Sequence, residues 1–351
     1  MSIILILIIF GVIIAFHEFG HFIVAKLNKI AVLEFSIGMG PAICSFTKKE
    51  TKYSIRLLPL GGYCMMLGED EEVDDDNAFG RKSVWARMAV VLAGPVFNFV
   101  LAFIFSVFLV HFTGCDPAKL SDVAENSAAY EAGIRPGDTI KAIDDGKIHN
   151  YRELLLYMQL HNDGSPVELT MERENGEVYT VSVVPRKDAD GNYKLGVMGG
   201  YIKPDSVGME LQYAGYELVY WVKATVTSLK LIITGQVGVN QIMGPVGVGD
   251  AFNEVIEEVK EESEPGKEVV INIILNMLNW SILLSVNLGV MNLLPIPALD
   301  GGRFLFLIIE AVRRKRIPQE KEALVNTIGF TILIALMVII FFNDIKNVFF
   351  R

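Results

Sequence analysis

The hydrophobic residues of this chain are concentrated in four long runs that carry few charges. These runs cover about 2–27, 88–113, 269–300 and 323–343. A bilayer core of about 30 Å is crossed by roughly 20 apolar residues in a helix. The pattern therefore predicts a polytopic α-helical membrane protein with four transmembrane helices.

The first run does not have the features of a cleaved secretory signal. It lacks a basic start and a small-residue cleavage site, and it is too long. We expect it to be retained in the membrane. Lys and Arg are frequent between the first two runs and in Arg313–Arg316. Because positively charged loops stay in the cytoplasm, both loops are predicted there, and the long segment between the second and third runs is predicted outside.

That outer segment begins with a polar region rich in Gly and Pro turns, at 114–200. Two runs with strand-like alternation, 166–173 and 177–184, are joined by a Glu-Asn-Gly turn, which is typical of a β-hairpin. Residues 150–161 have a helical pattern. The region is predicted to be a small β-rich domain.

The following residues, 201–268, are apolar but include four charged positions between 205 and 235. A fifth span would bury these charges, so we expect amphipathic helices at the interface instead. Two acidic runs, at 69–76 and 253–264, are predicted to be solvated.

Composition narrows the function classes. The chain has 351 residues, 52% of them hydrophobic and 21% charged, with a net charge of −10. These values exclude a disordered chain and a simple water-soluble enzyme, and they provide no basic field for nucleic acid. The three cysteines, Cys44, Cys64 and Cys115, indicate neither a disulfide framework nor a thiolate metal site.

The sequence His-Glu-Phe-Gly-His at 17–21 is the strongest chemical signal. On a helix, His17 and His21 share a face and can bind one Zn²⁺, with Glu18 close enough to serve as a general base. These residues lie within an apolar run, where an ion would offset the cost of burying them.

A catalytic zinc usually takes three protein ligands, so a third ligand is expected elsewhere. Glu34 is near in sequence, but it lies in the next loop and is not directed back. Asp300 is the better candidate, because Pro295 and Pro297 interrupt the helix before it. Broken backbone at membrane depth indicates the wall of a buried polar site. Two His and one Asp suit zinc well, although the sequence does not exclude another divalent metal.

Taken together, the zinc motif in the first span, the segment "AGIRPGDTI" that resembles a PDZ core, and "NLLPIPALDGG" at 292–302 resemble the site-2 protease family. The chain is most similar to the bacterial branch that cleaves membrane-bound anti-sigma factors. The resemblance implies that His17, His21 and Asp300 hold Zn²⁺, that Glu18 is the base, and that Asn292 binds substrate or stabilises the transition state. It also relates "AGPVFN" at 93–98 to the second span of the family, and "MGPVGV" at 243–248 to the segment after its PDZ domain.

The resemblance further implies a membrane-associated β-hairpin region at 35–41 and 53–66, and an inserted extracytoplasmic PDZ domain. The predicted division is a first transmembrane helix at 1–28, a cytoplasmic loop with the hairpin at 29–87, a second transmembrane helix at 88–113, the PDZ domain at 114–200, an amphipathic helical region at 201–268, a third transmembrane helix at 269–302, a basic cytoplasmic loop at 303–322, a fourth transmembrane helix at 323–343 and a tail at 344–351.

The expected activity is hydrolysis of peptide bonds in the transmembrane segment of a membrane protein, after a first cleavage by another protease. Residues 53–66 alternate like a strand and could offer an edge to an unwound substrate. The substrate-binding candidates are Tyr53, Ile55, Leu57, Gly61, Gly62, Asn292, Pro295 and Pro297. The PDZ domain would either recruit cut chain ends or exclude bulky substrates. The expected location is the bacterial cytoplasmic membrane.

Three other functions compete with this one. A membrane-anchored soluble metalloprotease would need the zinc motif and its third ligand in the polar region. A non-catalytic PDZ scaffold would leave Glu18 and Asp300 without a role. An ion carrier would use the same carboxylates without binding equimolar zinc.

Overall fold

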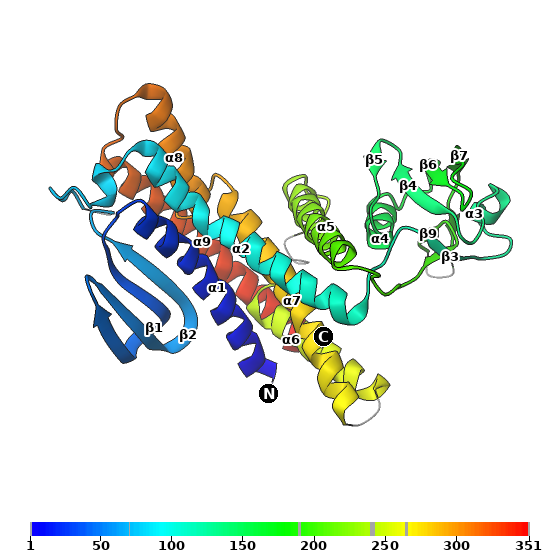
Figure 1. Cartoon of the computed structure of the whole chain (residues 1–351), viewed down its shortest axis with the longest axis horizontal. Coiled ribbons are helices and arrows are strands. Elements are labelled where there is room, and N and C mark those ends of the chain that lie inside the picture. Colours follow the sequence, from blue (N-terminus) through cyan, green and yellow to red (C-terminus); the bar gives the residue numbers. More distant parts are fainter. Residues whose placement is uncertain (1, 70, 189–190, 239–242, 264–265, 350–351) are drawn as a thin grey trace. The chain divides into compact units, whose positions relative to one another are not determined.

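The computed structural model describes residues 2–69, 71–188, 191–238, 243–263 and 266–349. Predictions that fall on the remaining positions, among them Asp70 of the first acidic run, lie outside the described residues. The chain divides into two compact units (Figure 1). The first comprises Met1–Phe105 and Trp221–Arg351, and the second comprises Ser106–Tyr220.

Four helices of the described chain are long and apolar enough to cross a membrane. They are α1 (Ser2–Leu27), α2 (Val84–Thr113), α7 (Lys267–Leu293) and α9 (Gln319–Phe349). Their apolar side chains face all directions, as expected for helices whose surroundings are lipid. The four predicted transmembrane helices are confirmed at this level.

The predicted loop at 303–322 is wrong in its first half. Helix α8 (Asp300–Arg313) begins at Asp300, and the chain turns at Arg314, which has a φ of 53°. The apolar residues of this helix recur at helical spacing, and Leu307 is buried. Arg313 therefore ends this helix, where a positive charge is favourable, and residues 314–316 of the basic cluster lie in the short loop before α9.

Strands β1 (Val32–Lys48) and β2 (Thr51–Met66) form a bent antiparallel sheet. Different parts of each strand pair with different parts of the other. Residues 44–48 are in register with 51–55. Farther along β1, Ile37 is in register with Ile55 on one side and with Gly62 on the other. Gly38 and Gly40 have positive φ values, which allows β1 to bend at this point. Residues 62–66 thus form one edge of the sheet.

Two helices follow in the region predicted to be amphipathic, α5 (Val207–Ile233) and α6 (Pro245–Glu262). Helix α6 carries the acidic side chains of 253–262 on its exposed side and buries Phe252 and Ile256. The N-terminus of α6 is capped from far away in the sequence. The Asp344 carboxylate of α9 accepts hydrogen bonds from the backbone N–H groups of Gly244, Val246 and Gly247, at 2.9–3.1 Å.

The second unit contains the β-rich region. Its main sheet has the order β5-β4-β6-β7, formed by Gly146–Lys147, Thr139–Ile143, Val167–Glu172 and Val178–Val183. The hairpin β6–β7 and the helix α4 (Tyr151–Leu160) lie where the sequence predicted them. The short elements are β3 (Leu120–Val123), α3 (Ala128–Glu131), β8 (Arg186–Lys187), β9 (Tyr193–Lys194), β10 (Val197–Gly199) and the 3-10 turn η1 (Phe79–Arg81) of the first unit. Fully buried Leu, Ile and Met side chains form the core of the sheet.

Candidate metal centre

The structure brings together the three predicted ligands from distant parts of the chain. His17 and His21 lie one turn apart on α1, and Asp300 is the first residue of α8. Oδ2 of Asp300 is 3.1 Å from Nε2 of His17 and 3.5 Å from Nε2 of His21. The two Nε2 atoms are 3.2 Å apart. Both imidazoles are buried.

These residues fit a zinc ion. Ligands about 2.0–2.1 Å from a tetrahedral zinc lie about 3.3–3.4 Å from one another. The three distances in the structure, 3.1, 3.2 and 3.5 Å, bracket that value. Oδ2 of Asp300 is buried and lies against the two Nε2 atoms. A cation between the three atoms would satisfy it, and one more coordination position would stay open for water or substrate.

Two glycines allow α1 and α2 to approach closely at the centre. A Cβ atom on Gly20 would lie 2.5 Å from the backbone oxygen of Ala93. A Cβ atom on Gly94 would lie 2.3 Å from Nε2 of His21 and 2.7 Å from Cε1 of His17. Any larger residue at Gly94 would therefore push into the imidazole pair.

Two further glycines allow the start of α8, and with it Asp300, to pack closely on the preceding backbone. A Cβ atom on Gly301 would lie 2.1 Å from the backbone oxygen of Leu294, and one on Gly302 would lie 2.4 Å from that of Ile296. The first turn of α8 therefore packs directly on the backbone after α7. Ala298, with a φ of 73°, donates its backbone N–H to Oδ1 of Asn326 on α9 at 3.2 Å. The sequence around Asp300 thus determines where its carboxylate lies.

Glu18 is partly buried beside the centre. Its carboxylate interacts electrostatically with His17, His21 and Asp300. A Cβ atom on Gly62 would lie 3.5 Å from Cγ of Glu18. The edge of the sheet formed by β2 therefore passes next to this side chain.

For three other predicted site residues, the structure shows only their position and burial. Asn292 is partly buried in the last turn of α7. Pro295 is exposed in the segment between α7 and α8. Pro297 is partly buried, and its Cβ would be 2.4 Å from a Cβ added to Gly329 of α9. The roles of these three residues stay predictions.

The prediction that all of 53–66 offers an edge to substrate needs a correction. Tyr53 is in register with Phe46 on one side and with Phe35 on the other, and Ile55 is likewise paired on both sides. A strand segment with two neighbours has no free edge. Gly61 and Gly62 lie at the end of β2 that borders Glu18, so the edge prediction is restricted to this end.

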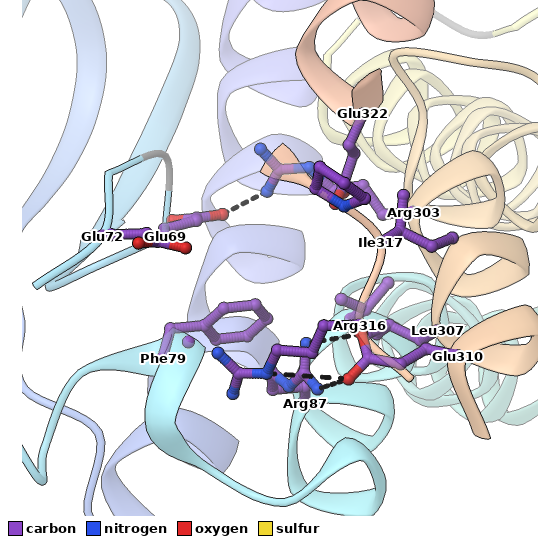
Figure 2. A pocket seen from close by; sticks show the side chains of 13 residues that line it. Glu69, Glu72, Phe79, Arg87, Arg303, Leu307, Glu310, Arg316, Ile317 and Glu322 are labelled. Atoms are coloured by element: carbon purple, nitrogen blue, oxygen red, sulfur yellow. Dashed lines mark hydrogen bonds and ion pairs between the residues drawn. The ribbon is translucent and has the colours of Figure 1, made fainter. Parts of the chain in front are cut away.

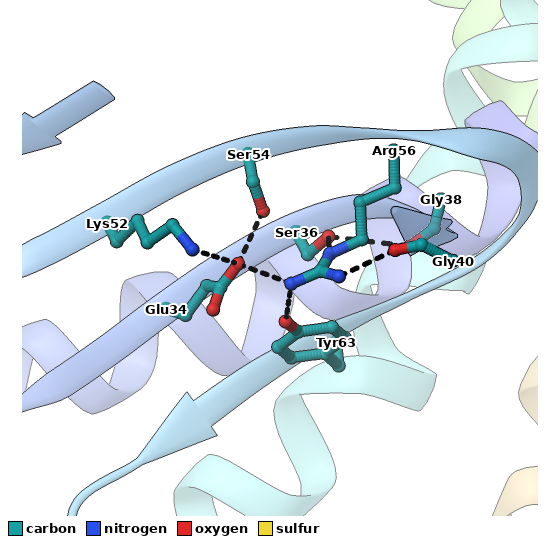
Figure 3. A network of polar contacts seen from close by, with 8 residues as sticks. All are labelled: Glu34, Ser36, Gly38, Gly40, Lys52, Ser54, Arg56 and Tyr63. Atoms are coloured by element: carbon teal, nitrogen blue, oxygen red, sulfur yellow. Dashed lines mark hydrogen bonds and ion pairs between the residues drawn. The ribbon is translucent and has the colours of Figure 1, made fainter. Parts of the chain in front are cut away.

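Glu34 is not a ligand in the described structure, as expected. It accepts hydrogen bonds from Ser54 Oγ at 2.6 Å and from the Arg56 guanidinium at 2.8 Å, within a polar network of the sheet (Figure 3). Partial desolvation raises the pKa of Glu34, but hydrogen bonds from Ser54, Arg56 and Tyr63 and the charge of Lys52 lower it further, to about 2. The ionised carboxylate holds two halves of the sheet together.

A polar pocket of about 320 Å³, which the sequence did not predict, lies between the end of the sheet region, α2 and α8 (Figure 2). Glu69 forms an ion pair there with Arg303, one turn after Asp300. Arg87 of α2 forms a bidentate pair with Glu310 of α8. The first acidic run was predicted to be solvated. Glu69 is an exception, because its side chain is only 15% exposed. No local sequence pattern predicts these ion pairs, because the two partners of each pair are more than 200 residues apart in sequence.

A second cavity, of about 430 Å³, adjoins Asp300 itself. It is lined by Ala298, Leu299, Asp300, Arg303, Asn326, Thr327 and Phe330. The carboxylate side of the centre is thus accessible from the space between α8 and α9.

Comparisons with known proteins agree with this geometry. The profile of Peptidase family M50 matches residues 5–336. The chain is 32% identical to the Regulator of sigma-W protease RasP of Bacillus subtilis, over 99% of both chains. It is 30% identical to the Zinc metalloprotease RasP of Geobacillus kaustophilus, over 99% of this chain and 98% of that one. It is 38% identical to a Clostridium perfringens protein described as a zinc metalloprotease, over 98% of both.

A solved PDZ domain from an SdrC-like protein of Listeria innocua is similar to 25% of this chain at 19% identity. Its TM-score of 0.23 is too low to assign a fold to the second unit. The family, in contrast, is shown over nearly the whole chain. The chain therefore belongs to peptidase family M50, the site-2 proteases, and is an intramembrane zinc metalloprotease with several transmembrane helices.

Proposed function

We propose that this protease cleaves a membrane protein within its transmembrane segment, using His17, His21 and Asp300 to hold zinc and Glu18 as general base. The proposal rests above all on the three ligand atoms that meet within 3.1–3.5 Å of one another. A zinc ion in such a site supplies an activated water and polarises the scissile carbonyl.

The protein's own residues complete the reaction. Glu18 accepts a proton as a water oxygen attacks the carbonyl carbon, and it delivers that proton to the amine as the C–N bond breaks. Asn292 donates a side-chain N–H to the oxyanion, an effect worth about 3–4 kcal/mol in other enzymes.

The substrate has to be extended at the cleaved bond, because a helix hides its carbonyl groups. We place this segment along the end of β2 at Gly61 and Gly62, since Gly62 lies next to Glu18. Backbone hydrogen bonds from an edge of a sheet suit an unwound segment of any sequence. Pro295 and Pro297 would line the opposite side of the substrate path.

The substrate class and location follow from the same proposal. The name of the Bacillus relative refers to the regulation of sigma-W, which supports an anti-sigma-factor-like substrate in the bacterial cytoplasmic membrane. The second unit is proposed to be an extracytoplasmic PDZ domain. It would restrict cleavage to substrates that another protease has already shortened.

The experiment compares wild type with Glu18→Gln on a model transmembrane peptide in detergent or nanodiscs. We expect Glu18→Gln to keep one zinc per chain and to lose cleavage. Cleavage by this variant at the wild-type rate would contradict the role of Glu18. Deleting 114–200 tests the PDZ role separately: a filter predicts cleavage of full-length substrate, whereas loss of all cleavage would contradict filtering.

A further inference from the structure

The motif Ala-Gly-Pro-Val-Phe-Asn of α2 has no role in the reaction as described so far, yet it faces the metal centre. Val90, Gly94 and Asn98 are spaced four residues apart, which places them on one face of the helix. Gly94 contacts both imidazoles. Val90 and Asn98 lie at hydrogen-bond distance from Nδ1 of His21 and of His17, respectively. This face of α2 therefore touches the far side of each metal-binding ring.

The backbone fixes the tautomer of His21. Its Nδ1 donates to the carbonyl oxygen of Val90 at 2.8 Å. A carbonyl oxygen can only accept, so Nδ1 of His21 carries the proton and Nε2 keeps a lone pair for a metal. No side-chain substitution at Val90 can remove this acceptor.

The tautomer of His17 depends on a side chain instead. Asn98 is fully buried, and its Nδ2 lies 3.0 Å from Nδ1 of His17, while its Oδ1 has no hydrogen-bond partner in the described chain. A half-turn about the Cβ–Cγ bond exchanges the amide nitrogen and oxygen, so both orientations have to be considered. If the amide nitrogen faces Nδ1, then Nδ1 must be unprotonated and the ring proton sits on Nε2, where it blocks a metal. If the amide oxygen faces Nδ1, then Nδ1 carries the proton and Nε2 is free to bind zinc. Nε2 is the atom that faces His21 and Asp300.

We propose that Asn98 is a positioning residue for zinc: its Oδ1 accepts a hydrogen bond from Nδ1–H of His17 and directs the Nε2 lone pair into the metal centre. This inference rests on the proposed ligand set. Two of the three ligands are thus oriented by one face of α2, one by a backbone carbonyl and the other by a side-chain amide. Hydrogen-bond partners of this kind are typically worth 10–100-fold in metal affinity.

The test measures zinc affinity of the full chain by competition with a chelator, in the Glu18→Gln background so that turnover does not interfere. Asn98→Leu removes the acceptor, and we expect zinc to bind about 10–100-fold more weakly. Asn98→Asp keeps an oxygen toward Nδ1, and we expect affinity at least equal to that of the parent. Should Asn98→Leu not fold, Asn98→Ala takes its place, with the same expectation.

Ser285→Ala is the matched control. Ser285 Oγ donates to the backbone oxygen of Asn98 at 2.8 Å, so this variant disturbs the packing of α7 on α2 without touching the amide. We expect it to bind zinc like the parent. Equal affinity in Asn98→Leu, or an Asn98→Asp variant as weak as Asn98→Leu, would overturn the proposal. If His17→Ala bound zinc as tightly as the parent chain does, the proposed ligand set itself would be overturned.

Discussion

At the residue scale, the candidate metal centre depends on glycines as well as on its three proposed ligands. Asp300 reaches the imidazoles because Gly301 and Gly302 leave room for the carbonyl groups of Leu294 and Ile296. That these three side chains lie together could be predicted, since helical spacing places His17 and His21 on one face and the broken helix before Asp300 indicates a buried polar site. The orientation of their rings could not, because it depends on α2, whose Gly and Asn positions have no unique meaning in a sequence.

Gly301→Ala is predicted to displace Asp300. The added Cβ would lie 2.1 Å from a backbone oxygen, so the first turn of α8 must move. A misplacement of about 1 Å can cost on the order of 100-fold in activity. We expect weaker zinc binding and at least a comparable loss of cleavage. Gly249→Ala on α6 is the control, because its Cβ would meet nothing within 4 Å; equal activity in both variants would contradict this account.

Glu34 is predicted to make the sheet sensitive to acid. Its pKa is about 2 in the folded chain, below the ordinary value of 4.5. A lowered pKa stabilises the fold above the unfolded value, and this stabilisation is lost as pH falls from about 4.5 toward 2. The midpoint of thermal unfolding should therefore change less in Glu34→Gln than in wild type when the pH is lowered from about 5 to about 3. Parallel pH profiles would refute the prediction.

At the element scale, the sequence located helices and strands well but not their pairing. The apolar runs gave α1, α2, α7 and α9, and the Asn-Gly turn gave β6–β7. Helix α8 was not predicted, because the basic residues at its end were interpreted as a loop. The double pairing of β1 and β2 was not predicted either, because it follows from bends at glycines that hydrophobic alternation does not reveal. Contacts between distant elements, such as Asp344 with the start of α6, leave no local pattern at all.

The ion pair between Arg87 and Glu310 is predicted to hold α2 against α8. The two side chains are 9% and 14% exposed and form two hydrogen bonds. Removing one partner of a buried pair typically costs about 3–5 kcal/mol. Glu310→Gln should lower the unfolding free energy by an amount of that order, measured in denaturant.

The exposed pair of Arg81 and Asp74 provides the control for that experiment. Because surface ion pairs contribute about 0–1 kcal/mol, Asp74→Asn should change stability little. A Glu310→Gln variant no less stable than Asp74→Asn would show that the buried pair does not join the helices.

At the scale of the whole molecule, the three proposed ligands lie in one unit, and the other unit contributes none of them. Metal removal should therefore act on the first unit alone. Zinc at 100 times its Kd stabilises the folded state by about 2.7 kcal/mol. On chelation, hydrogen exchange should rise in α1, in α8 and in the part of α2 before Ser106, while the β4–β7 sheet keeps its protection. An equal loss of protection in both units would contradict the prediction that zinc stabilises the first unit alone.

The most direct test of the central claim is the zinc content of the purified chain in the presence of a competing chelator. We predict one zinc per wild-type chain, and a marked loss in Asp300→Ala, although residue 300 is far in sequence from His17 and His21. Asp74→Ala, with an exposed carboxylate, should bind zinc like wild type. An Asp300→Ala variant that holds one zinc with unchanged affinity would contradict the claim that these three residues form the metal centre.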